Sequence, residues 1–189
     1  VANDTAAHGA EDAASIPVTL SGSDMDGTVA SFTLGALPTN GTLFLDAAHT
    51  QPVTPGTPIP AGAGGTTTLY FVPAPNWNGE TRFPYTATDN DNLASPPATA
   101  TIEVTPQNDA PVANDTTARG AEDAASIPVT LSGTDPDGSV ASFTLGALPT
   151  NGTLYLDAAH TQPVVPGTPI PAGAGGTTTL YFVPAPNWN

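Results

Sequence analysis

Short runs of alternating apolar and polar residues fill the first 106 positions, and clusters of Gly, Pro, Asn and Asp separate them. In the run at 15–20, Ile16, Val18 and Leu20 alternate with proline or hydroxyl residues. A period of two predicts β-strands with one buried face, and no stretch shows the 3.6-residue period of a helix. We therefore expect strands near 5–9, 15–20, 29–34, 41–46, 67–73, 81–89 and 100–106.

The same alternation predicts which side chains face inward. They are Ile16, Val18, Leu20, Ala30, Phe32, Leu34, Leu43, Leu45, Leu69, Phe71, Phe83, Tyr85, Ile102 and Val104. Residues 46–68 form one long connection, and a structureless loop of that length is improbable in a compact domain. We expect its proline-rich part, 51–60, to add an extended segment at a sheet edge, because proline is confined to edges.

Seven short strands with frequent turn signals predict an all-β, immunoglobulin-like antiparallel sandwich. An antibody-type domain is excluded, because the chain has no cysteine and the third predicted strand has no tryptophan. Trp77 and Trp188 occur instead in the loop sequence "PNWN". Each is expected to plug the end of a sandwich, and stacking on a sugar is the alternative.

The chain contains an internal repeat. Residues 1–78 align with 112–189, and only seven aligned pairs differ: 6/117, 8/119, 23/134, 25/136, 28/139, 44/155 and 54/165. The repeat defines a first domain, 1–111, with a C-terminal linker, and a near-identical second, 112–189, that lacks its last two strands. We expect two seven-stranded sandwiches arranged end to end. Three explanations for the missing strands stay open: a window of a longer array, which we favour, strands donated by another chain, or a frayed second repeat.

The formal net charge of −15 comes from 17 acidic residues against only two arginines and no lysine. Nucleic acid is therefore not an expected partner, because its phosphates require basic side chains. Membrane insertion is not expected either, because no run of 18 apolar residues occurs and no export leader is visible. The acids are not scattered: 13 of the 17 fall in short clusters at predicted turns.

Alternate loops of an up-and-down sandwich lie at opposite ends, which predicts where these clusters meet. Six carboxylates should converge where the two domains join, together with the amides of Asn108 and Asn114: Glu11, Asp12, Asp109, Asp115, Asp135 and Asp137. Equivalent acids should lie at the far end of each domain. In the first domain they are Asp4, Asp24, Asp26, Asp89 and Asp91, and in the second they are Glu122 and Asp123.

Close carboxylates repel by about 4 kcal/mol per pair at an effective dielectric constant near 20, so we expect a cation among them. Carboxylate, amide and carbonyl oxygens are the donors that Ca²⁺ prefers, and the clusters hold no thiol or imidazole for zinc or copper. An ordinary polar turn is the alternative for each Asp-Gly loop and for Glu11–Asp12.

Several motifs resemble the cadherin-like (immunoglobulin-like) tandem repeats of large bacterial surface adhesins of the repeats-in-toxin type. They are "NDAPVANDTT…AED", "DPDG", "NGTLYLD", "LYFVPAPNWNGETRFPYTATDNDN" and "ATIEVTPQNDAPVAND". The resemblance implies calcium ligands at Glu11, Asn108, Asp109, Asn114, Asp115, Asp135 and Asp137, and at Asp89 or Asp91 for a preceding junction. The chain departs from the cadherin pattern at "NWNGE", which leaves Asn78 or Glu80 as a candidate ligand only.

No nucleophile–base pair is visible, so we expect no enzyme. The leading hypothesis is a calcium-rigidified extender repeat of an extracellular adhesin or surface fibre that projects a binding tip. Its partners would be neighbouring repeats, and other copies through strand exchange or lateral contacts. The alternatives are a glycan- or cell-binding module and an accessory module of a secreted enzyme.

Overall fold

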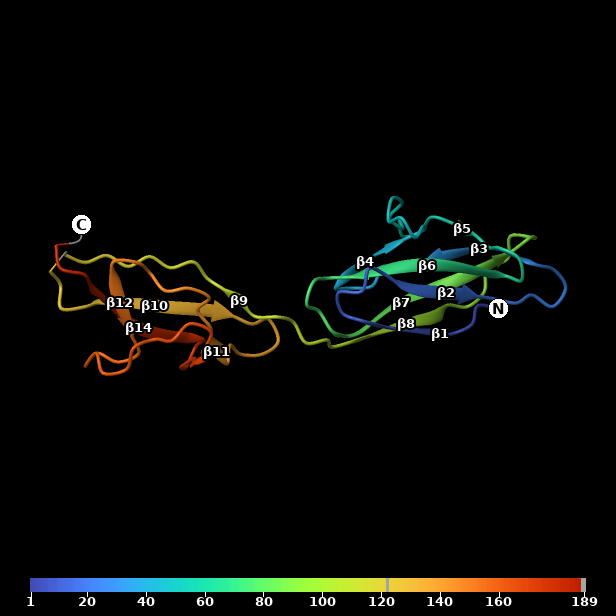
Figure 1. Ribbon diagram of the computed structural model, residues 1–189. Helices are drawn as coiled ribbons and strands as arrows, with labels where there is room; N and C mark the ends of the chain where they lie inside the picture. The colour runs from blue at the N-terminus through green and yellow to red at the C-terminus, as the bar shows by residue number, and fades with distance from the viewer. Residues whose placement is uncertain (122, 188–189) are drawn as a thin grey trace. The chain divides into compact units, whose positions relative to one another are not determined.

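The computed structural model describes residues 1–121 and 123–187. It divides the chain into two compact units, Val1–Gln107 (unit 1) and Asn108–Asn189 (unit 2). Both are built from β-strands joined by loops (Figure 1), and no helix occurs among the described residues. The all-β class expected from the alternating pattern is confirmed.

Unit 1 is a sandwich of two sheets. The larger sheet contains, in order across it, β1 (Thr5–Ala10), β8 (Ala98–Thr105), β7 (Gly79–Asp89), β3 (Val29–Leu34) and β5 (Ile59–Pro60). The smaller sheet contains β2 (Ile16–Ser21), β6 (Thr66–Pro73) and β4 (Gly41–Phe44). In Figure 1, β2 and β6 lie in front of β7 and β8. Two facing sheets with this strand order form an immunoglobulin-like sandwich.

The two edge strands of the larger sheet, β5 and β1, differ from the sequence-based expectation in strand number and in strand direction. Of the proline-rich edge segment expected over 51–60, only β5, at its end, is a strand of this sheet, and with it unit 1 has eight strands rather than seven. The prediction of a wholly antiparallel sandwich is wrong, because β1 pairs parallel with β8, from Thr5 opposite Ala100 to Ala10 opposite Thr105. Parallel pairing is possible here because the two strands are far apart in sequence and need no tight hairpin.

The core of unit 1 lies between the sheets and follows the alternation in most strands. Val18, Leu20, Phe32, Leu34, Phe71, Phe83, Ala100 and Ile102 are fully buried. Two inward predictions are wrong. Ala30 is exposed because the register of β3 against β7 shifts between Val29 and Ser31, and a bulge of this kind turns the side chain outward. Leu45 is 38% exposed, because β4 ends at Phe44 and Leu45 therefore lies outside the strand whose alternation was expected to turn it inward.

Unit 2 repeats the smaller sheet of unit 1 almost strand for strand. Its strands are β9 (Val112–Ala113), β10 (Ile127–Thr134), β11 (Ser142–Phe143), β12 (Gly152–Tyr155), β13 (Ile170–Pro171) and β14 (Thr177–Pro184). The order β12-β14-β10-β9 forms one sheet, and β11 pairs with β13. The counterpart of β3 is the shorter strand β11, which pairs with β13.

Two strand residues of unit 2 are less buried than their equivalents in unit 1. Val129 and Leu131 are only partly buried, whereas their equivalents Val18 and Leu20 are fully buried in unit 1. An apolar pocket lined by Ala118, Ile127, Val129, Pro149, Thr150, Leu154 and Phe182 opens on this side.

Candidate cation site

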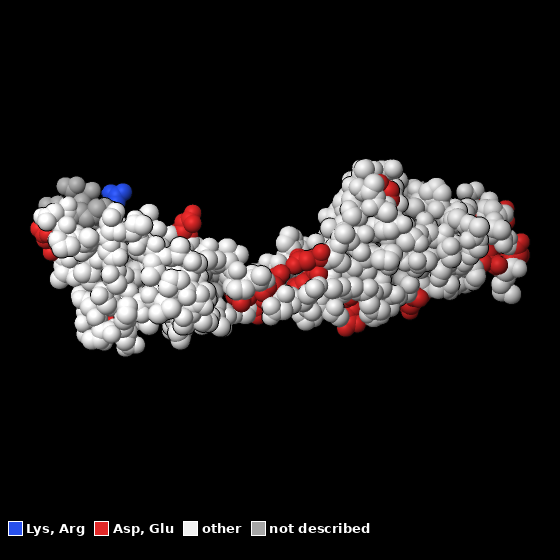
Figure 2. Space-filling model, viewed as in Figure 1, with Lys and Arg blue, Asp and Glu red and all other residues white. Residues whose placement is uncertain are grey.

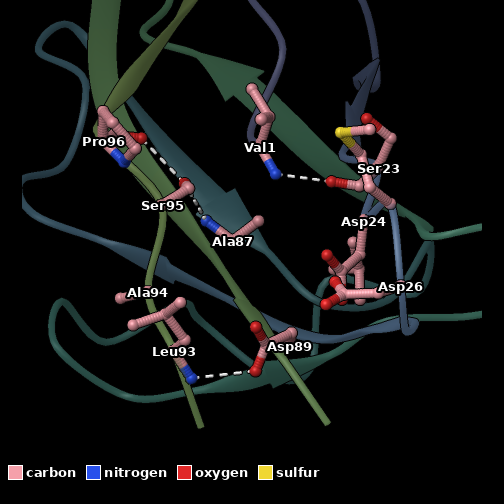
Figure 3. Close-up of a pocket in the computed structure, with 12 residues that line it drawn as sticks. Val1, Ser23, Asp24, Asp26, Ala87, Asp89, Leu93, Ala94, Ser95 and Pro96 are labelled. Atoms are coloured by element: carbon pink, nitrogen blue, oxygen red, sulfur yellow. Dashed lines mark hydrogen bonds between the residues drawn. The ribbon is translucent and has the colours of Figure 1, made fainter. Parts of the chain in front are cut away.

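Three carboxylates of unit 1 line one pocket of about 360 Å³ at the end of the sandwich that carries the N-terminus. Asp24 and Asp26 come from the loop between β2 and β3, and Asp89 is the last residue of β7. In Figure 3 the carboxylates of Asp24 and Asp26 lie next to each other, on the side of the pocket that faces Asp89. No lysine, arginine or histidine lines this pocket. Three of the five acids predicted for this end thus line one pocket.

Backbone hydrogen bonds hold the two loops in place. Asp89 Oδ1 accepts the amide protons of Asp91 at 2.9 Å and Leu93 at 2.8 Å, which closes the turn after β7. Asn90 Oδ1 accepts the amide of Thr28 at 2.7 Å and so connects this turn to the β2–β3 loop. The carboxylate of Asp89 is therefore positioned by its own turn, as is common for Asx residues.

The other two predicted acids at this end have different roles. Asp4 accepts the amide of Thr99 at 2.8 Å, where β1 begins beside β8. Asp91 is exposed and does not line the pocket. Sequence alternation alone does not distinguish these two residues from Asp24, Asp26 and Asp89.

The opposite end of unit 1 contains a buried carboxylate, since Glu11 is only 1% exposed. Its Oε1 accepts the amide of Gln107 at 2.6 Å, and its Oε2 accepts the side-chain amide of Asn78 at 3.1 Å. Asp12, in the left-handed region with φ 56°, accepts the amide of Asn76 at 3.1 Å. Glu11 therefore ties the β1–β2 turn to the loop before β7 and to the last residue of the unit.

Sequence reasoning named Asn78 only as a candidate metal ligand and missed Gln107. The amide of Gln107 carries no side-chain signal, so only the path of the chain after β8 reveals it. Trp77, next to Asn78, is partly buried against the core of unit 1, which confirms its interpretation as an end plug. Trp188 lies outside the described residues.

In unit 2, Asp109 is hydrogen-bonded to the loop between β10 and β11. The amide of Asp109 donates to both carboxylate oxygens of Asp137 at 3.3 Å, and Asp135 accepts the amide of Gly138 at 3.0 Å. Asn114 donates to the hydroxyl of Ser132 at 3.2 Å. Three further predicted ligands, Asn108, Asp115 and Asp123, are exposed, while Glu122 lies outside the described residues.

Two acids outside the clusters have a structural role. In the turn after β4, desolvation acts to raise the pKa of Asp46, but hydrogen bonds from the Thr50 hydroxyl and from the amides of Gln51 and Thr50 lower that pKa below its usual value. The Thr161 hydroxyl, and then backbone amides, likewise lower the pKa of Asp157 in the repeated turn. These carboxylates are satisfied by their own turn and are poor candidates for a cation.

Only oxygen donors are available in the acidic clusters. In unit 1 the side chains Arg82 and His8 pair instead with Glu80 at 2.5 Å and Glu103 at 3.0 Å, on the outer face of the larger sheet. Oxygen-only clusters fit a hard divalent cation such as Ca²⁺. Within 1–121 and 123–187, no three His, Asp or Glu side chains are gathered closely enough to hold a metal ion by themselves. The calcium ligands therefore stay a prediction.

Comparisons with known proteins add little to this description. No family model matches the chain, and no curated protein matches it. Among solved structures it is similar to one described as the D00-D0 domain of Intimin, with 11% identity over 96% of this chain and 82% of that chain, at a TM-score of 0.32. The described segments include no helix with the length and apolar character needed to span a membrane.

Proposed function

We propose that the chain is a calcium-stiffened extender of an extracellular adhesin or surface fibre. The observation that carries the proposal is the pocket in unit 1, where Asp24, Asp26 and Asp89 share one space without a cationic side chain. Carboxylates that face one pocket repel one another, and a divalent cation removes that repulsion; among the residues that line this pocket, the only positive group is the α-amino group of Val1, which donates to the Ser23 carbonyl. Calcium at such a site also couples the two loops that supply the acids.

The connection between the units gives the cation a mechanical role. Gln107 is held by buried Glu11 of unit 1, and Asp109, two residues further on, is held by Asp137 of unit 2. We propose that Ca²⁺ recruits these carboxylates, with Asp12, Asp115 and Asp135, and limits the freedom of the linker. Pro106 and Pro111 act in the same direction, because proline fixes φ.

We propose an extracellular location, where calcium modules work at dissociation constants of about 10⁻⁴ to 10⁻³ M. The proposed partners are neighbouring repeats of the same chain, and other copies through strand exchange or lateral contacts. We propose a structural role and no catalytic one.

The test uses the full 189-residue chain. Calorimetric titration of CaCl₂ is expected to release or absorb heat at saturable sites, and small-angle scattering is expected to show a larger maximum dimension in calcium than in EDTA. Variants D24N/D26N and D135N/D137N should each lose part of the bound calcium, and only the second should lose the change in dimension.

The matched control is E103Q, which removes one exposed acid outside the clusters and should leave both readouts unchanged. Equal calcium binding by D135N/D137N and the unsubstituted chain would contradict the proposal. An unchanged maximum dimension on calcium addition would contradict the extender role even if calcium binds.

A further inference from the structure

The outer face of the sheet β2-β6-β4 carries no charged side chain, although the chain has 17 acids. We name it the hydroxyl–aromatic face, and its residues are Pro17, Thr19, Ser21, Thr42, Phe44, Thr66, Thr68, Tyr70 and Val72. Figure 2 shows the surface over β2 and β6 of unit 1 without Asp, Glu, Lys or Arg. Every residue of this face is exposed or half-buried.

The lack of charge is specific to this face. The outer face of the other sheet in unit 1 carries Glu80, Arg82, Glu103 and His8, which form two ion pairs. The contrast between the two outer faces of one small domain calls for a reason beyond strand propensity, which favours Thr and aromatic residues on both.

The strand register arranges the rings in a row. Tyr70 lies opposite Pro17 of β2 on one side and opposite Phe44 of β4 on the other. Neighbouring strands are about 4.8 Å apart, so the three rings form a flat row about 10 Å long. The row beside it holds Thr19 and Thr68, whose hydroxyls are 3.2 Å apart.

Unit 2 preserves the same arrangement. Tyr181 lies opposite Pro128 and Tyr155, and the hydroxyls of Thr130 and Thr179 are 3.4 Å apart. Of the seven differences between the repeats, one falls on this face, at Phe44/Tyr155, and it keeps the ring.

A histidine supports the ring at the end of the row in both units. The rings of Phe44 and His49 have centroids 5.2 Å apart, and those of Tyr155 and His160 are 5.3 Å apart. Both histidines have φ 55° and belong to the turn that Asp46 or Asp157 closes. The end of the row is therefore a fixed position rather than a free side chain.

We propose that the hydroxyl–aromatic face binds an uncharged, β-linked hexopyranose polysaccharide. The apolar C–H faces of successive sugar rings would stack on Tyr70 and Phe44, while Thr19, Thr42 and Thr68 exchange hydrogen bonds with sugar hydroxyls. A tyrosine suits such a surface because it has an apolar body and a polar tip. The row of rings matches the length of a disaccharide.

Charge favours a neutral partner. A polyanion is repelled by a chain of net charge −15, and a cationic partner would be drawn to the acidic clusters rather than to an uncharged face. Two copies of the chain also repel each other at long range, because both carry this charge. A neutral polysaccharide faces no electrostatic penalty at this face.

The face shares no residue with the proposed calcium ligands, so the inference stands apart from the extender function. The experiment therefore uses the full chain in EDTA. Cellohexaose and chitohexaose are titrated by calorimetry, and binding to insoluble cellulose and chitin is measured by co-sedimentation. We expect binding of at least one oligosaccharide, and the same preference on the insoluble polymers.

The variant Y70A/Y181A is expected to weaken oligosaccharide binding at least about tenfold, because it removes the central ring of both rows. Y70F/Y181F keeps the rings and should weaken binding by no more than about fivefold, the scale of one neutral hydrogen bond of about 1 kcal/mol. F44Y, which gives unit 1 the residue of unit 2, should bind like the parent. R82A, on the outer face of the other sheet, is the control and should also bind like the parent.

Tryptophan fluorescence in urea checks that each variant is folded. Absence of binding to both oligosaccharides and both polymers overturns the proposal, as does equal binding by folded Y70A/Y181A and R82A. A second copy of the chain is the other occupant to test, by sedimentation velocity. If the chain self-associates and Y70A/Y181A abolishes that association, the proposal is overturned in favour of a second copy.

Discussion

Replacing Glu11 with glutamine tests how a buried carboxylate stabilises unit 1. The carboxylate accepts two hydrogen bonds, from the amide of Gln107 at 2.6 Å and from Asn78 at 3.1 Å. A glutamine of the same shape keeps one acceptor oxygen and turns an NH₂ group toward the other donor. One charge-assisted bond is lost and a buried donor is left without a partner.

A hydrogen bond to a charged group contributes about 1.5–3 kcal/mol, so E11Q should lower the free energy of unfolding of unit 1 by about 2 kcal/mol. With a urea m-value of about 2 kcal/mol per molar, the unfolding midpoint should fall by about 1 M. That loss is a substantial part of the 5–15 kcal/mol typical of a domain.

The assay is urea unfolding of the full chain in EDTA, followed by the fluorescence of Trp77, which is adjacent to Asn78. Trp188 is replaced by phenylalanine in every variant so that the signal reports unit 1. The matched control is D12N, which keeps the oxygen that accepts from Asn76 and tolerates the left-handed backbone of residue 12. It should shift the midpoint by less than about 0.3 M.

The same experiment in calcium separates the two roles of Glu11. The parent should gain stability by ligand linkage, and E11Q should gain less because a proposed ligand is missing. A midpoint of E11Q within about 0.2 M of the parent in EDTA would refute the reasoning that the buried carboxylate stabilises the unit.

Three further predictions concern single side chains of unit 1. Burial raises the pKa of Tyr85 above its ordinary value of 10.0. The free energy of unfolding should therefore be constant below about pH 10 and fall as the pH rises through the raised pKa of the folded state. Y85F should abolish that alkaline loss in urea titrations. Desolvation acts to raise the pKa of Asp46, but hydrogen bonding from Thr50 lowers it below the usual 3.8. The contribution of Asp46 to the free energy of unfolding should therefore be present above pH 3.8 and be lost as the pH falls through the lowered pKa. D46N should remove this loss of stability at acid pH in urea titrations. G41A should cost about 1–3 kcal/mol by thermal or urea unfolding, because the new Cβ would lie 2.3 Å from Phe71 Cζ.

The local sequence pattern predicts most of the strands and their buried faces. In β2, Ile16, Val18 and Leu20 alternate with outward residues, and all three are buried as expected. One buried face specifies the register of a strand, because a slip by one residue would turn every apolar side chain to water. The repeat and the proline-rich edge segment were also readable from the sequence, since both depend on nearby residues.

Predictions failed where a residue's environment is set by distant strands. The exposure of Ala30 follows from a bulge against β7, and the parallel pairing of β1 follows from where β8 passes, about 90 residues later. The acids show the same limit. Turn composition placed Asp24, Asp26 and Asp89 at one end, but only the folded chain separates them from Asp4, which bonds to the amide of Thr99.

By itself, then, the sequence determined the strands, their buried faces and the concentration of acids in turns, because side-chain alternation and turn chemistry act over a few residues. Only the tertiary structure decided that Glu11 is buried against Gln107 and that the sheet β2-β6-β4 presents rings in one row. Those features require pairing between segments far apart in the chain, and cross-strand register, not local pattern, brings their side chains together.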